Sequence, residues 1–174
     1  RRISPSVQLV NGRISDIKIT YAGAMTKYKT DPLTMALVNG LLQPILGDTV
    51  NMINALGVAG DRGIHVQEIH SSKEEEFVNL IKAEVVTDKE TFLVWGTLAG
   101  NNQPRIVKVN DVYVEAIPSG HMIFINNNDK PGIVGAVGTI LGDAKFNIAS
   151  ITFGRESVGG MAISVVNVDS SVAD

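Results

Sequence analysis

The feature that most constrains the fold is a succession of apolar segments in residues 121–168, each with its own periodicity. Residues 121–126 are typical of a strand, and residues 131–145 carry apolar side chains at helical spacing. Two further strand-like segments follow at 148–155 and 161–168. The order is β-α-β-β, most of the split βαβ pattern of ferredoxin-like domains, and we expect the last helix and strand of that pattern to be missing.

The residues before this segment predict a separate domain, so we expect an α+β protein with two domains. A chain of 174 residues suffices for two small domains. Pro118-Ser119-Gly120 has the composition of a linker, and we place the domains at 1–118 and 119–174. The first should be a mixed sheet beside helices, with elements at 16–21, 32–47, 55–61, 65–69, 77–86, 91–98, 106–109 and 112–114.

The helix expected at 32–47 has a start signal and an apolar stripe. Thr30 and Asp31 can cap its first turn, where Pro32 loses no hydrogen bond. The residues expected to face the core recur at helical spacing and are Leu33, Ala36, Leu37, Leu41 and Leu42.

Composition excludes several classes of function. The chain has no cysteine, which removes disulfides and thiolate chemistry and fits a reducing compartment. Its net charge of -3 and the lack of a Lys/Arg cluster argue against a nucleic-acid partner. No apolar run approaches the roughly 20 residues of a membrane span. We expect a cytoplasmic protein, and we interpret a chain that begins at Arg1 without Met as a piece of a longer one.

The polar turn between the strand at 121–126 and the following helix carries the candidate site. Asp129 could accept hydrogen bonds from the backbone N–H groups of Gly132 or Ile133, a cap that stabilises a helix by ~1 kcal/mol. Alternatively, the Asn127 amide and the Asp129 carboxylate could face a small zwitterion, with the helix N-terminus taking its carboxylate. Asn147 is similarly open, because such a residue often follows a helix C-terminus.

Residues 121–168 resemble an ACT domain. The motifs that carry this resemblance are Asp129-Lys130-Pro131-Gly132, Gly135, Gly138, Phe146-Asn147-Ile148-Ala149 and Gly159-Gly160-Met161-Ala162. The whole chain is similar to the C-terminal half of long-form D-3-phosphoglycerate dehydrogenases, whose intervening "allosteric substrate-binding" domain resembles residues 1–118. That part of the resemblance includes Val50-Asn51-Met52-Ile53-Asn54-Ala55, Arg62-Gly63 and Gly96-Thr97-Leu98.

The resemblance implies a regulatory role rather than catalysis by this fragment. In the family, a part absent here oxidises 3-phosphoglycerate with NAD, so no cofactor and no catalytic residue are expected in this chain. ACT domains of the family associate through their sheets and bind L-serine as a feedback inhibitor between two subunits. Carried over, the effector site comprises Asn127, Asp129, Gly132 and Ile133 of one subunit and Asn147 of its neighbour. At the position of Asn127, relatives often carry His or an aromatic residue.

The resemblance also suggests an anion-binding cluster near the end of the upstream domain, for which this chain offers Arg105 and Lys108. Two rival interpretations remain open. The chain could be part of the β subunit of an iron–sulfur L-serine dehydratase, whose domain resembles residues 1–118. It could also be a purely structural tail that holds an oligomer together and binds nothing.

Two other sites are disfavoured by spacing. Gly132, Gly135 and Gly138 recur every third residue and lack the G-x-G turn of a dinucleotide-binding fingerprint. His65 and His70 lie five apart on an expected strand, so they face opposite ways and cannot readily share a metal.

Overall fold

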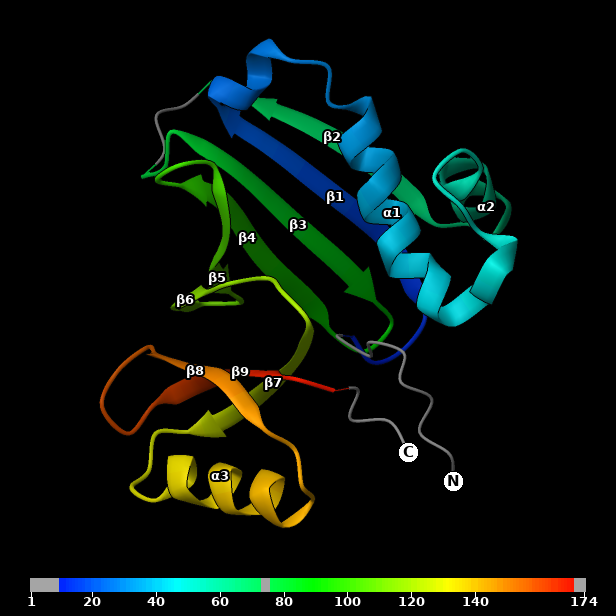
Figure 1. Ribbon diagram of the computed structural model, residues 1–174. Helices are drawn as coiled ribbons and strands as arrows, with labels where there is room; N and C mark the ends of the chain where they lie inside the picture. Colours follow the sequence, from blue (N-terminus) through cyan, green and yellow to red (C-terminus); the bar gives the residue numbers. More distant parts are fainter. Residues whose placement is uncertain (1–9, 73–75, 171–174) are drawn as a thin grey trace. The chain divides into compact units, whose positions relative to one another are not determined.

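The computed structural model describes residues 10–72 and 76–170 (Figure 1). Contacts divide the chain into two compact units, one within Ser6–Leu98 and one within Ala99–Asp174. The mixture of helices and two sheets confirms the α+β class. The sequence boundary near Pro118 stays a prediction.

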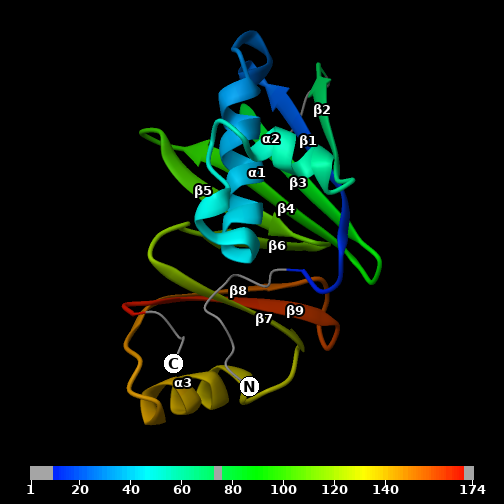
Figure 2. The same ribbon diagram turned by 90° about the vertical axis from the view of Figure 1, so that its right-hand side faces the viewer.

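The first unit is a mixed sheet with helices on one face, as predicted (Figures 1 and 2). Its strands lie in the order β2-β1-β3-β4, with β1 parallel to β2 and antiparallel to β3. Their bounds are Ile14–Gly23 (β1), His65–Ser71 (β2), Asn79–Thr87 (β3) and Thr91–Ala99 (β4). The helices are α1 (Asp31–Leu46) and α2 (Ala55–Asp61), with single 3-10 turns at Ala24–Lys27 and Gly47–Thr49.

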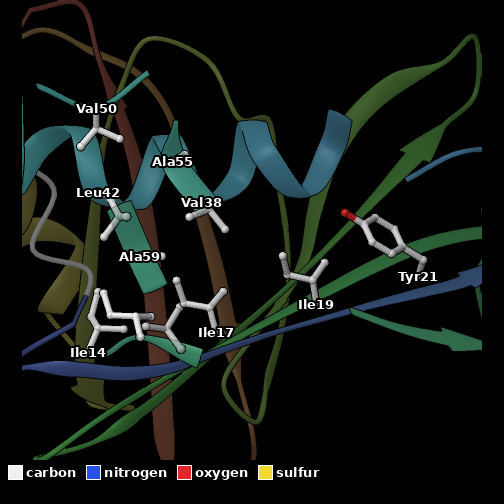
Figure 3. Packing of buried hydrophobic residues seen from close by; sticks show 11 residues of the cluster. Ile14, Ile17, Ile19, Tyr21, Val38, Leu42, Val50, Ala55 and Ala59 are labelled. Atoms are coloured by element: carbon white, nitrogen blue, oxygen red, sulfur yellow. The ribbon is translucent and has the colours of Figure 1, made fainter. Parts of the chain in front are cut away.

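The core of this unit lies between β1 and the two helices (Figure 3). Alternate residues of β1 point toward α1, and Ile17, Ile19 and Tyr21 are each fully buried. This alternation of buried and less buried residues is typical of a strand with one face on the core. Val38 and Leu42 of α1 pack against them.

The buried face of α1 differs from the predicted stripe. Its buried residues are Thr34, Val38 and Leu42, whereas Leu33 stays 41% exposed. The helix can bury Thr34 because its hydroxyl shares a 2.8 Å hydrogen bond with the phenol oxygen of Tyr21. Leu42 of the predicted stripe is buried, and Leu37 and Leu41 pack against the same core. Apolarity alone therefore found part of the buried face, but it missed Thr34 and wrongly included Leu33.

The expected cap of α1 is also wrong in its chemistry. Thr30 is the residue before the helix, but its side chain makes no capping hydrogen bond. Its hydroxyl instead donates to Oε2 of Glu68 at 3.2 Å and lies 3.2 Å from Nε2 of His70, both on β2. Thr30 thus ties the helix start to the neighbouring strand.

The second unit contains a hairpin and the predicted β-α-β-β segment. The hairpin pairs β5 (Gln103–Val109) with β6 (Val112–Ala116), and Asn110 in its turn has a positive φ of 52°. A three-stranded antiparallel sheet follows in the order β7-β9-β8. Its elements are β7 (His121–Asn128), α3 (Ile133–Asp143), β8 (Ile148–Arg155) and β9 (Met161–Val168). Helix α3 covers one face of this sheet (Figure 2).

The central strand β9 is buried on both faces from Ala162 to Val168. Val166 and Val168 pack against Val137 and Leu141 of α3. On the opposite face, Asn167 is 5% exposed and has every polar atom occupied. Its Nδ2 donates to the carbonyl oxygens of Ile117 (3.0 Å) and Ser119 (2.8 Å), and its Oδ1 accepts from Ser150. The connecting segment 117–119 is therefore bonded to the middle of the sheet.

Strands β6 and β8 of this unit approach closely at one glycine. A Cβ atom on Gly154 of β8 would lie 2.0 Å from the carbonyl oxygen of Tyr113 and 2.9 Å from Cγ1 of Val112. Real Cβ atoms do not approach so closely, so only glycine fits at this position.

Candidate functional site

The candidate site is a pocket of about 320 Å³ at the end of β7, beside the start of α3. It contains three of the predicted effector residues, Asn127, Asp129 and Ile133. The residues that line it are Asn127, Asp129, Lys130, Ile133, Val134, Phe153, Gly154, Arg155 and Ala162. Gly132 lies at the N-cap of α3 with a φ of 92°, next to the lining residue Ile133.

The strand register forms the floor of this pocket. Ala162 of β9 pairs with Asn127 of β7 on one side and with Arg155 of β8 on the other. Residues directly opposite each other on antiparallel strands project from the same face. Because Ala162 is small, the two polar side chains flank a low floor, and the first turn of α3 lies on the same side.

Asp129 is held by the loop that follows β8. Its Oδ2 accepts a 2.8 Å hydrogen bond from Nη1 of Arg155 and a 3.2 Å bond from the backbone N–H of Gly159. Its own backbone N–H donates to the carbonyl oxygen of Gly160. The Arg155 hydrogen bond, followed by that of Gly159, lowers the pKa of Asp129 below its ordinary value. Asp129 is therefore an anion already paired with a cation.

The interpretation of Asp129 as a helix cap is wrong. Helix α3 begins without a side-chain cap, and neither Gly132 nor Ile133 donates to the Asp129 carboxylate. The guanidinium of Arg155 at the end of β8 and the amide of Gly159 in the following loop are better donors, because the guanidinium carries a full charge. The cap prediction missed Arg155. Strand periodicity could have indicated it, because Arg155 lies two residues after Phe153 and both side chains therefore lie on the same face of the strand, where both line the pocket.

Asn127 is half-buried, and its side-chain amide contacts Asn128 and Ser164. Its Nδ2 donates to the backbone carbonyl of Asn128 at 2.8 Å. Its Oδ1 lies 3.5 Å from the buried hydroxyl of Ser164, at the long limit of a hydrogen bond. The amide thus lies in the pocket with weak internal bonding at its oxygen.

Asn147 lies at the other end of α3, away from this pocket. The helix of 11 residues separates them by about 16 Å. The Asn147 amide donates to Asp169 at 2.5 Å, and the residue that takes the left-handed conformation after the helix is Lys145. Within one chain, Asn147 is not brought together with Asp129, and its role at a neighbour's site stays a prediction.

Arg105 and Lys108 lie on β5 and contact their own neighbours. Arg105 donates to the carbonyl oxygen of Pro104 and to Oε1 of Gln103, and its Nε lies 3.9 Å from Glu115. The ammonium of Lys108 lies 5.0 Å from the centre of the Tyr113 ring. An anion site at these two residues stays a prediction.

The structure also bears on metal sites and membrane spans. In the ranges 10–72 and 76–170, no group of three His, Cys, Asp or Glu side chains is arranged to hold a metal ion. None of the helices in the part of the chain that the structure describes is long and apolar enough to cross a membrane.

Comparison with known proteins matches both parts of the chain to described families. Residues 5–110 match the D-3-phosphoglycerate dehydrogenase intervening domain, and residues 121–174 match the ACT domain. The chain is 38% identical over 167 residues to a D-3-phosphoglycerate dehydrogenase of Bacillus subtilis, which covers 96% of this chain and 32% of that protein.

Two archaeal relatives give similar values. The chain is 37% identical over 168 residues to the D-3-phosphoglycerate dehydrogenase of Methanocaldococcus jannaschii, covering 97% of this chain and 32% of the relative. It is 35% identical over 166 residues to that of Archaeoglobus fulgidus, covering 94% and 31%. The chain thus spans about a third of the length of the curated relatives it matches.

Proposed function

Because this chain belongs to the family of the D-3-phosphoglycerate dehydrogenase intervening domain and carries an ACT domain after it, we propose that its Asp129 pocket senses a small amino acid. The chain is the regulatory part of a dehydrogenase of serine biosynthesis, in the cytoplasm. Catalysis, with oxidation of 3-phosphoglycerate by NAD, belongs to a part that lies outside this chain. The relatives, which are longer and are named as dehydrogenases, support this assignment.

The observation that carries the proposal is the opposition of charges in one pocket. Asp129 supplies an anion for an ammonium group, while Arg155 and the start of α3 supply positive charge for a carboxylate. Asn127 adds an amide that can donate or accept. A volume of about 320 Å³ lies at the small end of the range of ligand sites, which suits a ligand the size of L-serine.

We further propose that the site is completed by a second copy of the chain. Asn147 is exposed and lies at the opposite end of α3, so an antiparallel neighbour could bring its amide to Asp129. Exposed apolar side chains on α3 support self-association, because Val134 and Ile140 are 50% and 66% exposed. An effector held by two protomers stabilises the one arrangement in which both can reach it.

Of the two rivals, the dehydratase interpretation lacks support from the relatives reported above, which are named as dehydrogenases. A binding experiment on the pocket distinguishes the structural tail from the amino-acid sensor. We expect isothermal titration with L-serine to give saturable heat, and Asp129→Asn to abolish it. Asp143→Asn, which changes an exposed acid at the far end of α3, is the matched control.

The proposal also predicts thermal stabilisation by the effector. A ligand at about 100 times its dissociation constant raises the free energy of unfolding by ~2.7 kcal/mol. No heat and no change in melting temperature with L-serine, glycine or other small amino acids would leave the structural tail as the better interpretation.

A further inference from the structure

We propose that Arg155 is the residue that selects the effector's carboxylate, and that it does so by leaving Asp129 when the ligand's ammonium arrives. The inference rests on the amino-acid site proposed above and adds a residue and an order of events to it. In the structure, the guanidinium is bound to the carboxylate that the ammonium needs. Ligand entry is then an exchange of ion-pair partners rather than a simple addition.

The present ion pair has the properties that such an exchange requires. The side chains of Arg155 and Asp129 are 55% and 30% exposed, and a single nitrogen of Arg155 makes the contact. An ion pair as open to solvent as this contributes little to stability, so its opening costs little. Gly159 donates to the same Oδ2 atom and keeps the carboxylate in place while the guanidinium leaves.

The guanidinium released from Asp129 is placed to bind the carboxylate of the ligand. Among the described residues, Asp129 is the one side chain to which Arg155 is hydrogen-bonded, so its other N–H groups can form a two-pronged contact with a carboxylate. The register places Arg155 across Ala162 from Asn127, on the face of the sheet that α3 covers. A carboxylate above Ala162 would lie between this guanidinium and the Asn127 amide.

The exchange predicts selection for zwitterions over plain cations. An ammonium without a carboxylate can displace Arg155 from Asp129, but it gives the released guanidinium no new partner. A carboxylate without an ammonium leaves the original ion pair closed. Only a ligand with both groups replaces one ion pair with two, and this holds for any small amino acid whose side chain fits the pocket.

The test compares L-serine with L-serinamide, which keeps the ammonium and lacks the carboxylate, by calorimetric titration of the full chain. We expect the unchanged chain to bind L-serine at least tenfold more tightly than L-serinamide. Arg155→Gln should weaken L-serine by about 10- to 100-fold, the range for a hydrogen bond to a charged group. It should leave L-serinamide unchanged or tighter, because Asp129 no longer has a competing cation.

Two further variants separate charge from geometry. Arg155→Lys keeps the charge without the planar fork and should fall between the unchanged chain and Arg155→Gln. Lys29→Gln removes an exposed cation of the first unit, outside the pocket, and should bind both ligands normally. Circular dichroism and melting temperature report whether each variant is folded, and Arg155→Lys serves as the test if Arg155→Gln is not.

The outcomes distinguish this inference from the proposed function. If Arg155→Gln binds L-serine as tightly as the unchanged chain and still rejects L-serinamide, the selection by Arg155 is wrong while the amino-acid site stands. If the unchanged chain binds neither ligand, the amino-acid site is wrong, and the inference falls with it.

Discussion

The phenol oxygen of Tyr21 and the hydroxyl oxygen of Thr34 lie 2.8 Å apart in the core of the first unit, where both residues are buried. Burial raises the pKa of Tyr21, so the phenol stays protonated and available for this bond. We expect Tyr21→Phe to lower the free energy of unfolding by about 1 kcal/mol, the usual effect of losing one buried hydrogen bond. Urea denaturation measures it, and Tyr28→Phe is the control because Tyr28 is 74% exposed.

Glu68 should make the stability of the first unit depend on acid. The hydroxyl of Thr34 lowers the pKa of Glu68, and His70 and Thr30 add to the effect, while partial burial opposes it. A lowered pKa in the folded state means that the stabilisation is complete above the ordinary glutamate value of about 4.3. It is lost as the pH falls through the lower value of the folded protein.

Glu68→Gln should therefore reduce the free energy of unfolding near neutral pH and flatten its decline in acid. Chemical denaturation between about pH 3 and about pH 7 gives the profile. Glu156→Gln, an exposed loop residue of the second unit, should leave the profile unchanged. Parallel profiles for the unchanged chain and Glu68→Gln would show that Glu68 does not contribute this acid sensitivity.

Gly154 should not tolerate a side chain. The added methyl group of Gly154→Ala would lie 2.0 Å from the backbone oxygen of Tyr113, and backbone cannot move aside cheaply. We expect a loss of about 1–3 kcal/mol or more, the cost of forcing extra atoms into packed space. Gly40→Ala in α1 meets no atom within 4 Å and should be neutral or stabilising, by up to about 1 kcal/mol. Equal melting temperatures for the two variants would contradict the close approach.

The two-protomer site can be tested by mixing variants that are each defective. Asp129→Asn and Asn147→Ala should both lose L-serine binding when assayed alone. In a symmetric dimer with one defect per protomer, a mixed pair has one site with both defects and one intact site. An equal mixture should then regain roughly a quarter of the sites if the protomers pair at random. Titration of the mixture after exchange gives the site number, and no recovery would mean that both residues act within one chain.

Much of the fold could be predicted because it depends on local patterns. Strands β8 and β9 begin and end at the predicted residues, since glycine and polar turns border their apolar runs. The place of Thr34 on the buried face of α1 could not be predicted from apolarity, because its partner Tyr21 lies thirteen residues away in the sequence. Its burial follows from tertiary contact rather than from propensity.

The candidate site shows the same division. Asn127 and Asp129 stand out in the sequence because they are polar residues between an apolar strand segment and a helix, and both line the pocket. Arg155 was not predicted, because its contact with Asp129 depends on the pairing of β8 with β9 and on the return of the loop at Gly159. The free N–H groups at the start of α3 did not indicate the actual donors to Asp129, which are Arg155 and Gly159.

The side chain of Asn167 restricts the conformation of the segment between β6 and β7. The Asn167 amide donates to two carbonyl oxygens of that segment, those of Ile117 and Ser119. The Ser150 hydroxyl on β8 donates to the oxygen of the same amide. Movement of residues 117–119 therefore acts directly on β9, the central strand of the sheet, rather than on its edge strands. Any displacement of residues 117–119 must either stretch these bonds or carry β9 along with it.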